Sequence, residues 1–444
     1  MFIGYPEYVE TALRLLDESG FVAFAVGGCI RDSIMGKKPD DWDITTSSTP
    51  EDTMEVFKDY RVIPTGIKHG TITVIIDGVH LEITTMRIDG EYHDSRRPDN
   101  VEFTTDIEQD LSRRDFTVNS MAYNQSSGLI DPFSGNQDIE AGIIRCVGNP
   151  DTRFNEDALR IMRALRFASV LDFTIEAETE KSIRKNAHLL ANVANERIRV
   201  ELIKLLRGNG VERILNEYKD VIFTIIPELK ETDGFEQNTP FHLFDVWTHT
   251  TKVVANVINT AELRLAALLH DIGKPQKFYT DENGVAHFKG HPELSAQIAF
   301  DIMKRLRFSN AEISKVCDII RLHDTRPNGS KSRITKLCSE YSCSIVRQAL
   351  ELMRSDTAGK NPEYYENDML SYSIAEKQID EIEQSDACLK ISDLKVNGKE
   401  IMALGFSGRE IGNILNKLLE LVIAEKTENK KEALLATAKK IKNI

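Results

Sequence analysis

Residues 27–48 read GGCIRDSIMGKKPDDWDITTSS and decide which fold we expect for the chain. Three aspartates crowd around one tryptophan just before the β-branched residues ITT. Asp41 and Asp43 are two residues apart, and side chains alternate along a strand, so both carboxylates should lie on one face with Trp42 turned into the core. Two adjacent carboxylates suit a divalent cation, whereas for these residues alone a solvated acidic turn is the alternative.

The first third of the chain has the alternating patterns of a mixed α/β region. An amphipathic helix is predicted near residues 7–19, and a strand within FVAFAVGG at 21–28. The runs TITVIID at 71–77 and HLEITTMR at 80–87 alternate as strands do. The dipeptide DG at 77–78 lies between them and predicts a hairpin.

Two further features of this region point to phosphate chemistry. Gly27 and Gly28 follow a strand and open toward a helix that bears Arg31 and Asp32, so their backbone amides can approach a phosphate closely. Glu82, on the HLEITT strand, is a candidate third acid. Two metal ions about 4 Å apart, held by such acids, can activate an attacking hydroxyl and neutralise a triphosphate.

The remainder of the chain should be helical. Beyond about residue 156 apolar residues recur every three or four positions, as in EDALRIMRALRFA, ERIRVELIKLL and ELRLAALLHDIG. We expect a loop at 148–157, a polar linker at 230–242 and a break near 361–367. Residues 389–444 read as short basic helices separated at GFSG and KTEN, which suggests a surface for a long anionic ligand.

Composition limits the class of protein. The 444 residues suffice for two to four cores of roughly 100–150 residues each. A content of 41% hydrophobic and 28% charged residues, with no apolar run of about 18 residues, is typical of a soluble protein and not of a membrane protein. The N-terminus is acidic and amphipathic, unlike a secretory signal, so we expect a cytoplasmic location.

Cysteine spacing and net charge exclude other classes. The six cysteines have no paired spacing, which argues against a zinc ribbon and against a disulfide framework. The formal net charge of -14 opposes global attraction to nucleic acid, because phosphate binding relies on lysine and arginine. Any polyanionic partner must therefore meet a local basic patch.

A family resemblance covers at least residues 21–207. The opening stretch, GIKHGTITV at 66–74 and LSRRDFTVNSMAYN at 111–124 together resemble the head of the class II tRNA nucleotidyltransferases, the CCA-adding enzymes and their bacterial poly(A) polymerase relatives. DPFSGNQDIEAGIIRCVG, EDALRIMRALRFA and ANERIRVELIKLL follow in family order. The resemblance implies an α+β fold, with a polymerase-β-like nucleotidyltransferase head, a small mixed sheet with helices, followed by an all-α neck, body and tail.

The resemblance also implies a domain division and a set of site residues. We expect a catalytic head at 1–147, a neck that recognises the nucleotide base at 148–232, an HD-type body at 233–360 and a basic tail that binds tRNA at 361–444. The catalytic residues implied are Asp41 and Asp43 as ligands of two Mg²⁺ ions, with Glu82 as a less certain third acid. The nucleotide-binding residues implied are Gly27, Gly28, Arg31, Arg113, Arg114, Asp115, Asn119, Asp157, Arg160, Arg163 and Arg166. For Arg113 and Arg114 beside Asp115, a surface ion pair is the alternative.

Asp157 and Arg160 suggest how bases are selected. They are three residues apart in EDALR and should share one helical face, where they present an acceptor beside donors. Cytosine and adenine each offer an amine donor next to a ring-nitrogen acceptor, whereas uracil and guanine present a carbonyl next to an N–H. One such pair can therefore accept C and A while it refuses U and G. The alternative is an intrahelical ion pair worth only about 0.3–0.5 kcal/mol.

Residues 84–103, TTMRIDGEYHDSRRPDNVEF, are polar and rich in opposed charges, so we expect a mobile loop. In the family that the chain resembles, a loop in this region accompanies the switch from C to A addition and is shortened in enzymes that add only CC. Its retention favours a full CCA adder. The residues implied are Arg87, Asp89, Asp94, Arg96 and Arg97.

A second constellation lies in the expected body. His270 and Asp271 at a helix end, His249 one helix earlier and Asp356 in LMRSDTAG resemble the HD superfamily of metal-dependent phosphohydrolases. His291 and His323 could complete a second metal position. Such a body is either a working phosphodiesterase or phosphatase that trims RNA ends, or a helical domain that retains the ligands without turnover.

The function expected is template-independent addition of C, C and A to the 3′ end of tRNA from CTP and ATP, with release of pyrophosphate. An A-adding enzyme or a poly(A) polymerase of the same fold is the nearest alternative, and an HD-type phosphohydrolase acting on RNA 3′ ends or cyclic phosphates is the alternative from another class. A purely RNA-binding role is disfavoured, because clustered acids repel phosphate. No membrane partner is expected, and the oligomeric state, monomer or dimer, stays open.

Overall fold

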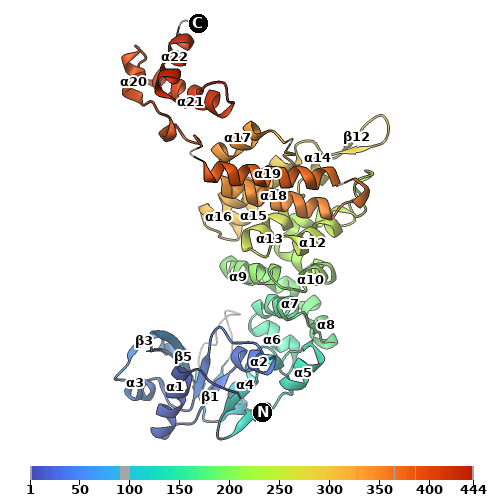
Figure 1. Cartoon of the computed structure of the whole chain (residues 1–444). Coiled ribbons are helices and arrows are strands. Elements are labelled where there is room, and N and C mark those ends of the chain that lie inside the picture. Colours follow the sequence, from blue (N-terminus) through green and yellow to red (C-terminus); the bar gives the residue numbers. More distant parts are fainter. Residues whose placement is uncertain (1–2, 91–100, 328, 365, 386, 443–444) are drawn as a thin grey trace. The chain divides into compact units, whose positions relative to one another are not determined.

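The computed structural model describes residues 3–90, 101–327, 329–364, 366–385 and 387–442 (Figure 1). By its internal contacts the chain divides into two compact units, Met1–Pro227 and Glu228–Ile444. The finer division into head, neck, body and tail stays a prediction. No helix in the described part of the chain is long and apolar enough to cross a membrane.

A mixed sheet of seven strands forms the centre of the first unit. The strand order is β3-β4-β5-β2-β1-β8-β9, and β2 runs parallel to β5 whereas the other neighbouring pairs are antiparallel. The predicted α+β class is confirmed. The strands are β1 (Ala23–Val26), β2 (Asp43–Thr46), β3 (Arg61–Gly66), β4 (Thr71–Ile76), β5 (Val79–Thr85), β8 (Ala122–Asn124) and β9 (Gly128–Ile130).

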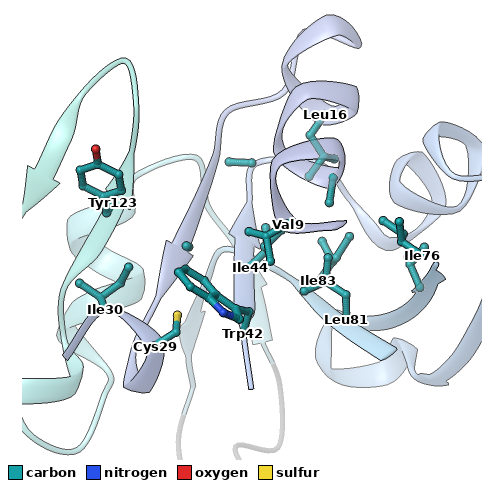
Figure 2. Close-up of a cluster of buried hydrophobic side chains, with 14 of the residues drawn as sticks. Val9, Leu16, Cys29, Ile30, Trp42, Ile44, Ile76, Leu81, Ile83 and Tyr123 are labelled. Carbon is teal, nitrogen blue, oxygen red and sulfur yellow. The ribbon is translucent and has the colours of Figure 1, made fainter. Parts of the chain in front are cut away.

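The local patterns of the sequence explain this sheet. In the β4–β5 hairpin Asp77 and Gly78 both have positive φ, 50° and 79°, as a tight two-residue turn requires. Helix α1 (Glu7–Glu18) buries Val9, Ala12 and Leu16 on one face. Figure 2 shows Val9 and Leu16 in one cluster with Trp42, Ile44 and the β5 residues Leu81 and Ile83. The predicted helix, hairpin and inward tryptophan are therefore confirmed.

The segment 84–103 is only partly a loop. Strand β5 continues to Thr85, and β6 (Arg87–Asp89) pairs antiparallel with β7 (Val101–Phe103). The expectation of a loop throughout is wrong at both ends, because Ile88, Val101 and Phe103 supply strand-forming side chains among the polar residues. Arg87 and Asp89 lie on β6, whereas Asp94, Arg96 and Arg97 lie outside the described residues.

Helices follow the sheet within the first unit. Those of the head are α2 (Gly28–Ile34), α3 (Pro50–Val56), α4 (Ile107–Ser112) and α5 (Gly135–Ala141). Those beyond it are α6 (Pro150–Glu156), α7 (Leu159–Leu171), α8 (Ala177–Asn186), α9 (Asn195–Leu206), α10 (Val211–Glu217) and α11 (Lys219–Ile225). Short strands β10 (Ile143–Ile144) and β11 (Thr174–Ile175) pair in parallel.

Helix α6 corrects the loop expected at 148–157. The Asn149 side chain accepts a hydrogen bond from the Thr152 backbone N–H at 3.2 Å, and Pro150 occupies the first turn. Both are helix-start signals, since an N-cap acceptor satisfies a free amide and proline needs no donor there. The prediction of a loop at 148–157 therefore missed the start of this helix.

The second unit is built of helices, as predicted. After the 3₁₀ segment Pro227–Thr232, no helix or strand occurs until Val246, which agrees with a polar linker. The main helices are α12 (Val246–Asn256), α13 (Ala261–Leu269), α14 (Lys274–Lys277), α15 (His291–Arg305), α16 (Asn310–Leu322), α17 (Lys331–Tyr341), α18 (Cys343–Ala358) and α19 (Glu366–Gln384). A small hairpin joins β12 (Tyr279–Thr280) to β13 (Ala286–His287).

Three short helices complete the chain. They are α20 (Gly398–Ala403), α21 (Arg409–Ile423) and α22 (Lys431–Lys442). The predicted separators GFSG and KTEN fall between them, so that expectation is confirmed. Ile401, Leu418 and Leu434 are fully buried in a core that these helices share.

Candidate functional site

Asp43 and Glu82 lie on two parallel strands of the head, and Asp41 precedes the first of them. Asp43 opens β2 and is the direct register partner of Glu82 in β5. Asp41 and Asp43 are exposed while Trp42 between them is buried, so the predicted alternation is present. Neighbouring strands lie about 4.8 Å apart, which makes the Asp43 and Glu82 side chains neighbours.

The electrostatics of Asp43 fit a cation. Partial desolvation by the surrounding protein raises the pKa of the Asp43 carboxyl, Glu82 and Asp41 raise it further, and Arg114 opposes them. The three carboxylates outnumber this arginine, so the cluster carries net negative charge. Among the described residues the three carboxylates do not converge to within 4.8 Å. Mg²⁺ does not require all three carboxylates to converge, because it takes one or two of them and keeps water and substrate phosphates as its other ligands.

The backbone of Gly27 lies close to the Arg114 side chain. It precedes α2 with φ 80°, and a Cβ there would lie 3.1 Å from the Arg114 Nη1 atom. Any other residue is therefore strained by its backbone angle and crowds an arginine. The absence of a side chain leaves the amides of this turn open to the cavity described below.

A chain of hydrogen bonds joins α2 to α7 through the RRD motif. Arg31 Nη1 donates to Asn119 Oδ1 at 2.6 Å, Asn119 Nδ2 donates to Asp115 Oδ1 at 3.4 Å, and Arg163 Nε donates to Asp115 Oδ2 at 2.7 Å. Burial raises the pKa of Asp115, but Arg163 and Arg160 outweigh burial and hold it below its usual value. Asp115 is therefore ionised, and it holds Arg163 of α7 directly and Arg31 of α2 through Asn119.

Arg113 and Arg114 share a different carboxylate. Both contact the fully buried Asp110, at 2.7 Å from Arg113 Nη2 and 3.2 Å from Arg114 Nη2. Arg113 Nη1 also lies 3.8 Å from Asp89 on β6. The alternative of a surface ion pair is wrong, because the partner is Asp110 in the interior and not Asp115. The sequence interpretation missed Asp110, which lies one helical turn before the arginines.

Phe167 organises three of the arginines. The guanidinium carbons of Arg166, Arg31 and Arg163 lie 3.9, 5.3 and 5.4 Å from its ring centroid. Cation–π contacts of this kind hold guanidinium groups in fixed positions. Sequence interpretation missed Phe167, although an aromatic side chain within an arginine-rich helix was a visible signal.

Asp157 does not lie on the helix that was expected to carry it. It has extended backbone angles, φ -146° and ψ 102°, between α6 and α7, and its Oδ1 atom accepts from the Leu159 backbone N–H at 3.1 Å. A short acidic side chain favours such a capping position over a helix interior. The expectation that Asp157 and Arg160 share a helical face is therefore wrong.

The partners of these two residues also differ from an intrahelical pair. Arg197 donates to both Asp157 oxygens, at 2.7 Å from Nη2 and 3.2 Å from Nη1. Arg160 Nη1 donates to Glu156 Oε2 at 2.6 Å, and its Nη2 donates to the Arg113 carbonyl at 3.2 Å. Each side chain is thus held by a separate partner.

The arginines, Asn119, Asp115 and Asp157 line one cavity of about 480 Å³. It gathers every predicted nucleotide-binding residue together with Asp43, and adds Leu159, Phe167 and Arg197, whereas Asp41 and Glu82 do not line it. A larger hollow of about 890 Å³ in the head contains Tyr5, Lys37 and Trp42 but none of these arginines. The 480 Å³ cavity is therefore the candidate nucleotide site.

The second unit contains a separate metal-ligand cluster. His249, His270, Asp271 and Asp356 place ligand atoms within 4.8 Å of one another, and so do Asp271, His291 and His323. His249 Nε2 lies 2.8 Å from Asp356 Oδ1, and His270 Nε2 lies 3.1 Å from Asp271 Oδ2. The two sets share Asp271, whose Oδ1 atom faces His291 Nε2 at 3.3 Å.

Backbone carbonyls orient the four histidines. Each Nδ1 atom lies against a carbonyl oxygen, of Ala267 for His270, Ile320 for His323, Phe288 for His291 and Gly359 for His249, at 2.6–3.4 Å. An N–H on Nδ1 leaves Nε2 as the ligand atom, which is the usual second contact of metal-bound histidine. Buried imidazole and carboxylate ligands together suit a transition metal.

Three family models match the chain. They are the Poly A polymerase head domain at residues 23–145, the Probable RNA and SrmB- binding site of polymerase A at 172–231 and tRNA nucleotidyltransferase domain 2 at 276–438. The CCA-adding enzyme of Ligilactobacillus salivarius is 32% identical over 98% of this chain and 97% of its own length. The chain belongs to the CCA-adding enzyme family.

Other CCA-adding enzymes support this membership. That of Pediococcus pentosaceus is 32% identical over 98% of each chain. The crystal structure of the Bacillus stearothermophilus CCA-adding enzyme in complex with CTP has a TM-score of 0.74 and 28% identity, and covers 98% of this chain and 97% of that one. A CCA-adding enzyme is a tRNA nucleotidyltransferase, and membership of this family implies dependence on a divalent metal.

Proposed function

We propose that the 480 Å³ cavity holds the incoming CTP or ATP, and that Asp41 and Asp43, with Glu82, hold two Mg²⁺ ions at its edge. The enzyme adds C, C and A to the 3′ end of tRNA without a nucleic-acid template and releases pyrophosphate. One observation carries the proposal. A single cavity brings the arginines, Asp43, Asp157 and Arg160 together from three separate parts of the sequence.

The arginines are placed to bind the triphosphate. Arg31 and Arg114 flank the Gly27 turn, and Arg113 shares Asp110 with Arg114. Guanidinium groups match phosphate oxygens in geometry and stay charged at every physiological pH. Because Asn119 and Asp110 already orient them, these groups lose little freedom when the nucleotide binds.

Asp41, Asp43 and Glu82 are placed at the reacting end. When bound there, Mg²⁺ supplies activation of the tRNA 3′ hydroxyl and neutralisation of charge at the α-phosphate. The acids hold their position because β2 and β5 are paired and Trp42 is anchored in the core. The hydroxyl attacks the α-phosphate as the bond to the leaving pyrophosphate breaks.

Asp157 and Arg160 are proposed to select the base. An ionised carboxylate has about four acceptor positions, so the two bonds from Arg197 and the one from the Leu159 N–H leave Asp157 one position for the amine of cytosine or adenine. Arg160 is held by Glu156 and lines the same cavity. Uracil and guanine would place a carbonyl oxygen against the Asp157 carboxylate.

The product formed on tRNA that lacks its 3′ end tests this proposal. Purified enzyme is incubated with that tRNA, Mg²⁺ and all four nucleoside triphosphates, and the added residues are sequenced. We expect C, C, A and no further extension. Long A tracts would favour the poly(A) alternative, a single A would favour the A-adding alternative, and incorporation of U as readily as C would refute the proposed base selection.

We also propose a metal-dependent phosphohydrolase activity for the second unit, on RNA 3′ ends or cyclic phosphates. The specific support is the buried cluster around Asp271, because the Nε2 atoms of four histidines lie within 3.9 Å of its carboxylate oxygens. His270→Ala with Asp271→Asn should abolish hydrolysis and leave nucleotide addition intact. Simultaneous loss of addition would show that the activities are not separable.

The tail is proposed to bind the tRNA substrate. Helix α22 supplies a basic surface, with Lys439, Lys440 and Lys442 in its last turn, and we assign this surface of the tail to tRNA. The proposed division keeps the head at 1–147, the neck at 148–232, the body at 233–360 and the tail at 361–444. A cytoplasmic location accompanies an enzyme whose substrate is tRNA.

A further inference from the structure

Two lysines lie against the metal-ligand cluster of the second unit. Lys274 Nζ lies 2.6 Å from Asp271 Oδ2, and Lys360 Nζ lies 2.6 Å from Asp356 Oδ2. Lys274 is 4% exposed and is held by Gln237 Oε1 at 2.8 Å and by the Phe288 ring at 5.5 Å. Each ammonium group therefore contacts a carboxylate oxygen of a proposed metal ligand.

His242 lies beside the same cluster without a ligand role. Its ring centroid is 5.7 Å from that of His249, and its buried Nε2 atom has no hydrogen-bond partner. Nδ1 lies 2.7 Å from the Thr239 hydroxyl, so with that hydroxyl as donor Nε2 carries the hydrogen.

The charge balance of this cluster is the central observation. The carboxylates of Asp271 and Asp356 are already neutralised by Lys274 and Lys360, and the histidines are neutral as metal ligands. A divalent cation in either ligand set adds two positive charges to a buried site, and a second cation adds two more. Uncompensated buried charge is costly, so an anion must enter with the metal.

We propose that Lys274, Lys360 and His242 form a phosphate subsite on the metal cluster, filled when the metal binds. This inference rests on the phosphohydrolase function proposed above and names the group that its substrate presents. As the metal takes the Asp271 and Asp356 oxygens, the ammonium groups are released toward phosphate oxygens, and His242 Nε2 donates to a third oxygen. Lys360 follows the end of α18 at Ala358, and its side chain is 22% exposed.

The chain positions Lys360 by its backbone. Gly359 packs against His249, whose ring atoms would lie 3.2 Å from a Cβ at that position, and the Gly359 carbonyl accepts from His249 Nδ1. Asn361 N–H donates to the Phe241 carbonyl at 2.9 Å, next to His242. Hydrogen bonds from the turn after α18 therefore hold Lys360 near His249 and His242.

The test measures linkage between a metal and phosphate in the full chain. Co²⁺ is titrated in the presence and absence of inorganic phosphate, and the visible absorption of nitrogen-ligated Co²⁺ reports this cluster separately from the carboxylate site of the head. We expect phosphate to tighten Co²⁺ binding by about tenfold in the wild type. Binding without any effect of phosphate would refute the subsite alone, whereas absence of nitrogen-ligated Co²⁺ would refute the metal centre and the subsite together.

Variants assign the effect to the lysine. Lys360→Met should bind Co²⁺ more tightly without phosphate, because a competing ammonium is gone, and should lose most of the phosphate effect. Lys360→Arg should restore it, and Lys277→Met, which removes an exposed charge from α14, should match the wild type. A Lys360→Met protein with unchanged linkage would overturn the inference.

His242→Phe and the choice of phosphate complete the design. The phenylalanine variant should retain Co²⁺ affinity and lose about tenfold in phosphate affinity, and unchanged phosphate affinity would remove His242 from the subsite. An oligoribonucleotide with a 3′-phosphate that binds more tightly than inorganic phosphate would identify an RNA end as the source. Equal affinities would identify free phosphate.

Discussion

Asp157 accepts hydrogen bonds at 2.7 and 3.2 Å from Arg197, which lies forty residues later in the chain, and not from Arg160 within its own motif. The carboxylate is therefore oriented by α9 before any nucleotide arrives. Arg160 is oriented separately by Glu156. The acceptor and the donor of the proposed base pocket each have an independent support, and each support can be removed alone.

Arg197→Ala should reduce base discrimination more than it reduces triphosphate binding. The Asp157 carboxylate loses its orientation, so the preference for CTP over UTP should fall by about tenfold or more. The measurement is the ratio of kcat/KM for the two nucleotides. Lys204→Ala, an exposed change on the same helix, is the control. A wild-type ratio in Arg197→Ala would show that the contact is only structural.

Asp43→Asn should reduce nucleotide addition by about a thousandfold or more, because a proposed metal ligand is lost next to Glu82. Asp40→Asn is the matched control, since Asp40 lies three residues earlier and lines the other hollow of the head. The two variants are compared in single-turnover addition of C to tRNA. Comparable losses in both would mean that general negative charge matters and a specific metal position does not.

Asp110→Asn should destabilise the first unit and weaken nucleotide binding. It leaves Arg113 and Arg114 without their buried partner, a change that typically costs about 3–5 kcal/mol. Urea unfolding measures the stability, and KM for CTP measures the binding. Thr104→Ala, which removes a hydroxyl that donates to Gln109 Oε1 and accepts from the Asp106 N–H, should change neither.

The first unit should lose stability in acid through Asp115. Burial raises the pKa of Asp115, but Arg163 and Arg160 outweigh burial, so the folded pKa lies below the ordinary value of 3.8. A depressed folded pKa contributes stability that is present above the unfolded pKa and lost as the pH falls through the folded value. Asp115→Asn should therefore be destabilising at pH 7, and the difference from wild type in urea unfolding should shrink below about pH 3. A difference independent of pH would contradict the ion-pair role.

Gly27→Ala should impair addition without unfolding the protein. The φ of 80° is unfavourable for alanine, and the new methyl group would lie 3.1 Å from Arg114 Nη1 in the cavity. We expect KM for CTP to rise with little loss of secondary structure by circular dichroism. Gly20→Ala, where φ is also positive at 86° but no atom lies within 4 Å of the added methyl group, should leave addition unchanged. An unaffected Gly27→Ala enzyme would remove this turn from the triphosphate site.

The sequence was most informative where structure depends on neighbouring residues. The Asp77–Gly78 turn, the alternation around Trp42 and the helices of residues 389–444 follow from local rules, and all three are present. The resemblance supplied the nucleotide-binding residues, all of which line one cavity. Neither the local rules nor the resemblance predicted the hydrogen bonds and ion pairs that hold those residues in place.

The missed features depend on distant partners or on competing local signals. Arg197 reaches Asp157 across forty residues, and Asp110 supports two arginines from the interior, so no spacing rule identifies either. Helix α6 was hidden because an Asn-Pro pair reads equally as a turn or as a helix start. Lys360 and His242 are far apart in the sequence, and they become neighbours of the metal cluster only because α18 and the segment before α12 meet there.

The most direct measurement compares CTP with UTP in the wild type and in Asp157→Ala, as kcat/KM for addition to tRNA that lacks its 3′ end. We expect the wild type to prefer CTP by about a hundredfold or more, and the variant to lose most of that preference while it still extends tRNA. An Asp157→Ala enzyme that keeps the wild-type preference would contradict base selection by this cavity.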